Sequence, residues 1–230
     1  MKYFKEYVLH GTGPLTTTGL DAQIFTKSSI AKKNGLKSND LQLVQVLIGE
    51  SSNRKKGADN ASKYFNWDIQ KDDTSQWGFD KPISDDEIAK SVMAVIMNVR
   101  PQSFGTLKLV SSNPFAHPAI DPGYLQNEED LEVLMEGWEM LEEIYKKEPY
   151  KSMGAEFATF SQFSTRKEMA QYLYNNYLLT IYHPVGTARM GNLKSDKYAV
   201  CSERLRVRGF SNLRCADASI APDIVSGNTQ

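Results

Sequence analysis

The feature of the sequence that most constrains the fold is an amphipathic helix predicted over residues 128–147. Asn127 can cap its acidic first turn, and Lys146-Lys147 close its last turn, as the helix dipole favours. Its apolar side chains recur every three or four residues and so form one stripe, made of Leu131, Leu134, Trp138, Leu141 and Tyr145. The acidic residues of this helix are interpreted as a solvated outer face, in preference to a cation site.

Two strands are predicted ahead of this helix. Residues 92–99 form a short apolar run that stops at Arg100-Pro101, and both its length and its termination favour a buried strand over a helix. Residues 106–109 alternate apolar and polar side chains between turn-forming segments, as expected of a half-buried strand.

The remaining segments carry weaker signals. A second helix is predicted over residues 165–175, where a capping box marks the start, and the β-forming residues 177–182 predict a strand. Residues 204–209 alternate like a strand that ends in a turn, whereas 10–19 and 50–81 are interpreted as irregular or surface segments. Strands and helices mix without a regular βαβ alternation, so the sequence predicts an α+β fold and not a doubly wound sheet.

Charge and composition exclude several classes of protein. Lys and Arg number 27 against 28 Asp and Glu, a balance that argues against a nucleic-acid partner and gives no polybasic handle for a membrane. No apolar run reaches the roughly 18 residues of a membrane span, and the N-terminus lacks the apolar core of a secretory signal. We therefore expect a soluble globular protein.

Local motifs for common chemistries are missing. The sequence contains no G-x-G-x-x-G, P-loop, G-x-S-x-G or H-E-x-x-H motif, and its three histidines are too far apart for a local metal site. Cys201 and Cys215 are interpreted as small buried residues, not as a redox pair. His10 and His117 are interpreted as structural or surface residues.

Two places in the C-terminal quarter could carry chemistry. His183 opens the rigid turn 184–187, and a histidine at the mouth of such a turn suits a general base near neutral pH, although a structural histidine fits as well. Asp217 is followed by small residues that could place backbone amides against a phosphate or a flavin, although an ordinary strand end also fits.

Taken together, the sequence resembles the C-terminal half of the glucose–methanol–choline (GMC) oxidoreductases, flavoenzymes that oxidise alcohols. The resemblance covers most of residues 85–230. It rests on Arg-Pro-Gln-Ser-Phe-Gly at 100–105 with Leu-Lys-Leu at 107–109, Pro-Ala-Ile-Asp-Pro-Gly-Tyr-Leu at 118–125, Tyr-His-Pro-Val-Gly-Thr-Ala-Arg-Met-Gly at 182–191, Leu-Arg-Val-Arg-Gly at 205–209, and residues 212–228.

The resemblance implies a reaction and its residues. His183 stands at the position of the family's catalytic histidine and would take the hydroxyl proton of an alcohol, whose hydride passes to the flavin. Asn228 stands at the position of the second member of the catalytic pair and would hold the substrate oxygen. Asp217, Ala218 and Thr229 fall on positions that look like FAD contacts, made mainly by backbone groups. No metal is implied.

The resemblance also implies an architecture. Residues 1–178 would form the substrate-binding domain, an antiparallel sheet covered by helices, in which 1–84 match the family only loosely. Residues 179–230 would return to the FAD-binding domain as its catalytic segment.

The sequence departs from the family pattern in the Gly-rich N-terminal half, which is absent, and in ending at Gln230. We expect the chain alone to bind FAD poorly and to be inactive, because the ADP portion of the cofactor has no cradle. Two functions stay open: part of an FAD-dependent alcohol dehydrogenase or oxidase, and a non-catalytic fragment or binding module that keeps the substrate-domain fold. A hydrolase is a distant third.

Other properties stay open. The sequence names neither the alcohol nor the electron acceptor, which is oxygen or a quinone in the implied reaction. The sequon at Asn60 fits export, as the resemblance suggests, and chance occurrence equally well, so the compartment is not assigned.

Overall fold

The computed structural model describes residues 2–13, 16, 22–47, 92–154, 163, 165–176 and 180–229. The predictions for 50–81, for Asn60 and for 177–179 lie outside these residues. The chain forms two compact units. One comprises Met1–Ile24, Leu43–Ile96 and Trp138–Asn176, and the other comprises Phe25–Gln42, Met97–Gly137 and Tyr177–Gln230.

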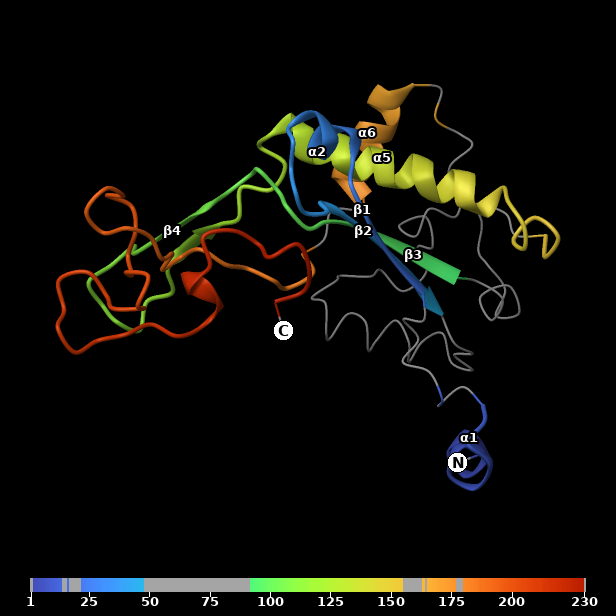
Figure 1. Cartoon of the computed structure of the whole chain (residues 1–230), viewed down its shortest axis with the longest axis horizontal. Helices are drawn as coiled ribbons and strands as arrows, with labels where there is room; N and C mark the ends of the chain where they lie inside the picture. The colour runs from blue at the N-terminus through green and yellow to red at the C-terminus, as the bar shows by residue number, and fades with distance from the viewer. Residues whose placement is uncertain are drawn as a thin grey trace. The chain divides into compact units, whose positions relative to one another are not determined.

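A three-stranded sheet contains β1 (Ala22–Thr26), β2 (Leu41–Leu47) and β3 (Val92–Asn98), in that order (Figure 1). The Asp40 N–H donates to the Thr26 carbonyl at 3.3 Å, and the Val99 N–H donates to the Asp40 carbonyl at 2.8 Å. The ends of β1 and β3 therefore both lie at the start of β2, so the central strand is antiparallel to each neighbour. β3 confirms the strand predicted over 92–99.

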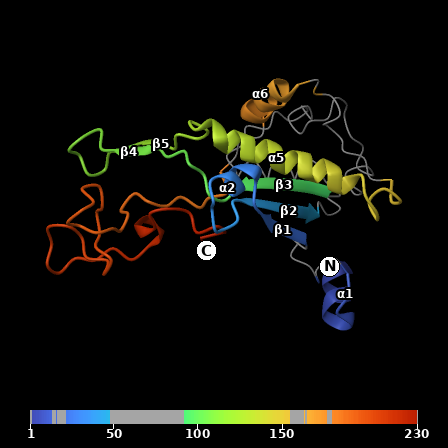
Figure 2. The same ribbon diagram turned by 45° about the horizontal axis from the view of Figure 1, so that its top comes forward.

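The helix α5 (Glu128–Tyr145) confirms the main prediction, although it ends before the two lysines. The Glu129 N–H donates to Asn127 Oδ1 at 2.9 Å, which is the predicted cap. Figure 2 shows α5 running along one face of the sheet. The predicted solvated face is wrong for Asp130, whose side chain is buried because a turn of the chain covers it.

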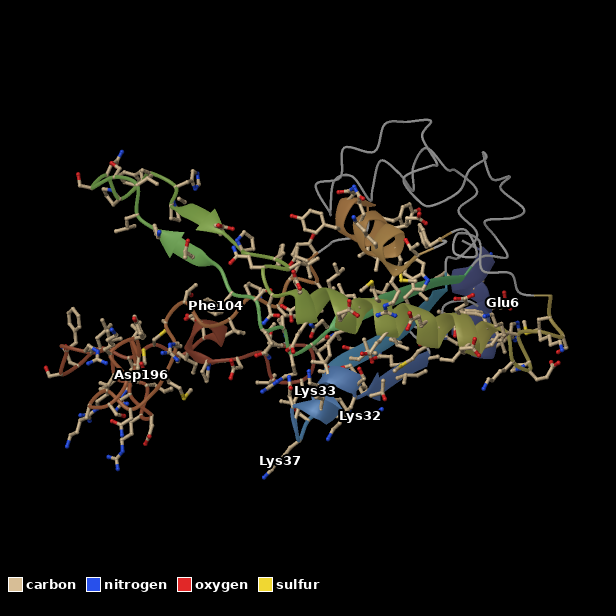
Figure 3. The ribbon with its side chains drawn as sticks, turned by 90° about the horizontal axis from the view of Figure 1, so that it is seen from above. Glu6, Lys32, Lys33, Lys37, Phe104 and Asp196 are labelled. Atoms are coloured by element: carbon tan, nitrogen blue, oxygen red, sulfur yellow. The ribbon has the colours of Figure 1, made fainter. Side chains whose placement is uncertain are left out.

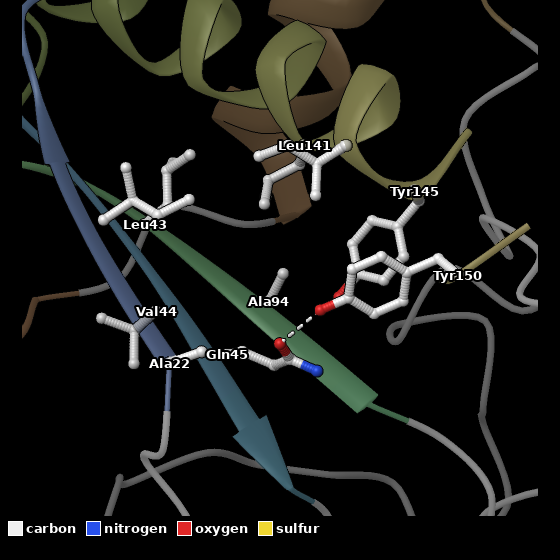
Figure 4. Close-up of a pocket in the computed structure, with 10 residues that line it drawn as sticks. Ala22, Leu43, Val44, Gln45, Ala94, Leu141, Tyr145 and Tyr150 are labelled. Atoms are coloured by element: carbon white, nitrogen blue, oxygen red, sulfur yellow. Dashed lines mark hydrogen bonds between the residues drawn. The ribbon is translucent and has the colours of Figure 1, made fainter. Parts of the chain in front are cut away.

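A small cavity of ≈ 80 Å³ lies between α5 and the sheet (Figure 4). Leu141 and Ile144 of the helix face Leu43 of the sheet across it, and the Tyr150 hydroxyl donates to Gln45 Oε1 at 2.8 Å at one end. Its lining is largely apolar and contains none of the predicted site residues.

Three further helices are present among the described residues. α6 (Arg166–Asn176) confirms the second predicted helix, and the Glu168 N–H donates to Thr165 Oγ1 at 3.2 Å as its cap. α1 (Lys2–His10) and α2 (Ser29–Lys33) were not predicted. α2 begins at a buried Ser28, whose hydroxyl accepts a hydrogen bond from the Ala31 N–H at 3.0 Å.

Strands β4 (Thr106–Lys108) and β5 (Ala119–Asp121) form an antiparallel hairpin. A Cβ added to Gly105 would lie 1.8 Å from the Asp121 carbonyl, so the close approach of these two segments requires glycine. The strand predicted over 106–109 is present, but its predicted half-burial is wrong because every residue of β4 is exposed. Phe104, just before β4 in Figure 3, is 84% exposed.

The C-terminal segment is built of loops. Residues 180–182 do not continue the predicted strand, since Tyr182 is in the left-handed region with φ 62°. Residues 204–209 form isolated bridges in place of a regular strand, and η3 (Ala218–Ile220) is a short 3-10 helix. Antiparallel sheets with helices agree with the predicted α+β class. Within the described part of the chain, no helix has the length and apolar character needed to cross a bilayer.

Candidate active site

His183 lies in a loop whose backbone is held by the segment around η3. Its side chain is buried, with 9% of its surface exposed. The Ala188 N–H donates to the Ser219 carbonyl at 3.0 Å, and the Met190 N–H donates to the Ile220 carbonyl at 2.8 Å. These two bonds place the loop that follows His183 directly beside the predicted cofactor segment.

The backbone on both sides of this site is in unusual conformations. Tyr182, immediately before His183, has φ 62°, and Ser226, two residues before Asn228, has φ 57°. A residue other than glycine in this region costs of order 1–3 kcal/mol and persists only where surrounding contacts enforce it. Such strain often marks functional sites, and both segments carry it, although Leu125 and Leu205 also have positive φ.

The C-terminal loop reaches His183 through Thr229. The Thr229 N–H donates to His183 Nδ1 at 3.4 Å, and Thr229 Oγ1 lies 3.2 Å from the same ring nitrogen. The carbonyl carbon of Asn228 is bonded to that amide nitrogen, so the Asn228 backbone lies next to the ring as well. The structure thus brings His183 and Thr229 into contact, while the predicted role of the Asn228 side chain stays a prediction.

Arg100 anchors the C-terminal loop from the other side. Its guanidinium Nη1 donates to the Ile224 carbonyl at 2.8 Å. The turn after Arg100 is in turn held by Asp130 of α5, whose Oδ1 accepts from the Gln102 N–H at 2.8 Å and whose Oδ2 accepts from the Ser103 N–H at 2.7 Å. This support was not predicted from the sequence, although the Arg100-Pro101 pair marks the turn.

Arginines also organise the long loop between the two halves of the site. Arg208 donates to the carbonyls of Ala199 at 3.0 Å, Leu193 at 2.9 Å and Asp196 at 2.7 Å. Arg189 forms an ion pair with Asp196 at 2.9 Å, and Figure 3 shows Asp196 within this group of loops. Where little regular backbone bonding is available, guanidinium groups bind the free carbonyls instead.

The side chain of Asp217 stabilises the start of the short helix η3. Its Oδ1 accepts a hydrogen bond from the Ser219 N–H at 2.7 Å and so caps η3. A hydrogen bond from the Ser219 side chain, the larger effect, and one from its backbone N–H lower the pKa of the Asp217 carboxyl, because they stabilise the charged form. The side chain of Ala218 is a methyl group, so any polar contact from this residue to a cofactor must come from its backbone.

The predicted positions are confirmed for His10, His117 and Cys201, whereas the predicted burial is wrong for Cys215, which is only partly buried. His10 and His117 are exposed, which confirms surface positions. Cys201 is fully buried and both cysteines are free, and burial is the main cause that raises the pKa of the Cys201 thiol. The described residues hold no group of three or more His, Cys, Asp or Glu side chains that could bind a metal.

Comparison with known proteins gives a consistent result. Residues 101–230 match the family model described as GMC oxidoreductase. The chain is 36% identical over 135 residues to the alcohol dehydrogenase [acceptor] of Pseudomonas putida, a match that covers 58% of this chain and 24% of the relative. It is 39% identical over 133 residues to the human mitochondrial choline dehydrogenase, covering 56% and 22% respectively. The chain thus spans about a quarter of the length of these relatives.

Solved structures show the same fold. A crystal structure of formate oxidase matches 99% of this chain and 38% of its own chain, with a TM-score of 0.68 and 22% identity. A pyridoxine 4-oxidase structure matches 83% of this chain and 31% of its own, with a TM-score of 0.59 and 21% identity.

Proposed function

Because the chain belongs to the GMC oxidoreductase family, we propose that it is the C-terminal part of an FAD-dependent oxidoreductase that acts on CH–OH groups. The observation that carries this proposal is the contact of His183 Nδ1 with the backbone N–H and the hydroxyl of Thr229, the residue that directly follows Asn228. Residues 1–178 would bind the substrate, and residues 179–230 would complete the FAD-binding domain and supply the reacting side chains. The relatives named as alcohol and choline dehydrogenases support a small-molecule alcohol as the substrate class.

His183 would act on the proton of the substrate hydroxyl. Its Nδ1 is engaged by Thr229, and Nε2 is the ring nitrogen left to meet a substrate oxygen. Asn228 would donate an amide hydrogen bond to the same oxygen and steady it as the proton leaves. General-base assistance of this kind accelerates reactions by about 10²–10⁴.

The residues around His183 would contact the flavin end of FAD. Asn228 and Thr229 follow one another on the loop that contacts His183, so both would lie beside the flavin. The backbone groups of Asp217 and Ala218 would contact the cofactor, since the Asp217 carboxylate already caps η3. When bound, FAD supplies the hydride acceptor, with oxygen or a quinone as the final oxidant.

The ADP portion of FAD needs residues beyond these 230, which contain no Gly-rich dinucleotide motif. The proposal therefore predicts that the chain alone retains little flavin after mixing with FAD and desalting. It also predicts that a polypeptide joining these residues to an FAD-binding half retains flavin and is reduced by members of a panel of alcohols. Retained flavin that no alcohol reduces would favour the alternative of a non-catalytic binding module.

A further inference from the structure

His183 Nδ1 lies within hydrogen-bond distance of the backbone N–H and the hydroxyl of Thr229, and these two groups place different requirements on the protonation of Nδ1. The Thr229 backbone N–H can only donate a hydrogen bond, so its contact at 3.4 Å requires a lone pair on Nδ1. The Thr229 hydroxyl, at 3.2 Å, can either donate to that lone pair or accept a proton from Nδ1. A neutral imidazole carries one N–H proton, so when Nδ1 is unprotonated the proton is on Nε2.

We propose that Thr229 is a positioning residue that sets the tautomer of His183. With Nδ1 unprotonated, both Thr229 groups can donate to it, and the ring carries its proton on Nε2. With Nδ1 protonated, only the hydroxyl offers an acceptor, and the backbone N–H is left pointing at another N–H group. The resting state is therefore the Nε2–H tautomer, and the Thr229 hydroxyl is what makes the other tautomer accessible.

The two tautomers would have different roles in the proton transfer at the proposed site. This inference rests on the proposed function and refines it. The Nε2–H form donates a hydrogen bond to an alcohol oxygen and cannot take its proton there. The Nδ1–H form presents a lone pair at Nε2. In that form the O–H bond of the alcohol breaks, its electron pair stays on oxygen, and the proton forms a bond to Nε2. The resulting imidazolium is held through Nδ1–H by Thr229 Oγ1.

Burial of the ring makes Thr229 decisive in this choice. His183 is only 9% exposed, so water competes little for its hydrogen bonds. Among the described residues, Thr229 provides all the hydrogen bonds that the structure gives to the ring nitrogens. A change confined to the Thr229 side chain should therefore appear directly in the tautomer ratio.

Nitrogen NMR of the 230-residue chain labelled with ¹⁵N-histidine tests the proposal without flavin or alcohol. The spectra would be recorded at about pH 8.5, where histidine is neutral. His183→Gln identifies the signals of His183 among the three histidines. The wild-type chain should show mainly the Nε2–H form, and a majority of the Nδ1–H form would overturn the assignment without recourse to any variant.

Thr229→Val keeps the backbone N–H and the side-chain shape but removes the hydroxyl. In the Nε2–H form the backbone N–H still donates to the single lone pair of Nδ1, whereas in the Nδ1–H form no acceptor remains, so the Nδ1–H form should fall about fivefold to tenfold relative to the other form. That is the change expected from losing one net hydrogen bond. Thr229→Ser keeps the hydroxyl and should stay within about twofold of wild type. An unchanged ratio in Thr229→Val, or an equal shift in both variants, would refute the role of the hydroxyl. These spectra are recorded without flavin or alcohol, so they do not depend on whether the protein oxidises alcohols. The tautomer proposal and the proposed function can therefore fail independently.

Discussion

The buried carboxylate of Asp130 gives the sharpest prediction about stability. It is 2% exposed and accepts hydrogen bonds from Asn98 Nδ2 at 3.0 Å, from the Gln102 N–H at 2.8 Å and from the Ser103 N–H at 2.7 Å. It therefore joins the end of β3 and the turn after Arg100 to the first turn of α5.

Asp130→Asn keeps one oxygen but places an amide NH₂ where Oδ2 now faces the Ser103 N–H. A hydrogen bond to a charged group is worth about 1.5–3 kcal/mol, and a buried donor left without a partner costs about 1–3 kcal/mol. Because the variant keeps one oxygen acceptor and the turn can relax, these terms do not add in full. We expect the free energy of unfolding to fall by about 2–4 kcal/mol.

Urea unfolding followed by circular dichroism measures this change, with Glu128→Gln as the matched control. Glu128 lies in the same first turn and is exposed, so its neutralisation removes a charge near the helix dipole at a cost of only about 0.3–1 kcal/mol. If Asp130→Asn unfolds within about 0.5 kcal/mol of wild type, or no more readily than the control, the proposed anchoring of the turn is wrong.

Three further predictions concern single residues. Because the folded-state pKa of Asp217 is lowered from 3.8, its stabilisation is complete above that pH and is lost as pH falls through the folded pKa; urea midpoints measured across acidic pH should show this loss, and Asp217→Asn should lack it. The buried Cys201 thiol, with its raised pKa, should react with iodoacetamide much more slowly than Cys215 in the native chain, as peptide mass spectrometry would show; equal rates would contradict its burial. Gly105→Ala should break the β4–β5 hairpin, because the new methyl group would overlap the Asp121 carbonyl; protected hairpin amides that exchange as slowly as in wild type would argue against this close approach.

The elements predicted correctly are those whose signals are local. The stripe and cap of α5 and the apolar run over residues 92–97 of β3 are local, so they can be recognised without knowledge of the rest of the fold. The alternation over 106–109 gave the strand but not its burial, because burial depends on what covers the hairpin. β2 was missed although Leu and Val alternate with Gln in its sequence and Val44 and Val46 are β-branched, a signal that was present in the sequence.

At the site too, local features could be predicted from the sequence, whereas contacts between distant segments could not. The turn around His183 and the small residues after Asp217 could be selected from sequence, since glycine and proline mark special backbone positions. The contact of His183 with Thr229 joins segments 46 positions apart, and no periodic pattern encodes it. The burial of Asp130 was likewise hidden, because the helix pattern places it on the polar face and only the distant turn supplies its donors.

The central claim is that His183 handles the substrate proton in an alcohol-oxidising flavoenzyme. Its most direct test is the rate at which an alcohol bleaches the visible absorbance of FAD in a polypeptide that joins these residues to an FAD-binding half, compared between wild type and His183→Gln at equal flavin content. We predict a rate about 10²–10⁴ lower in the variant. A variant that bleaches within about threefold of the wild-type rate would contradict the claim.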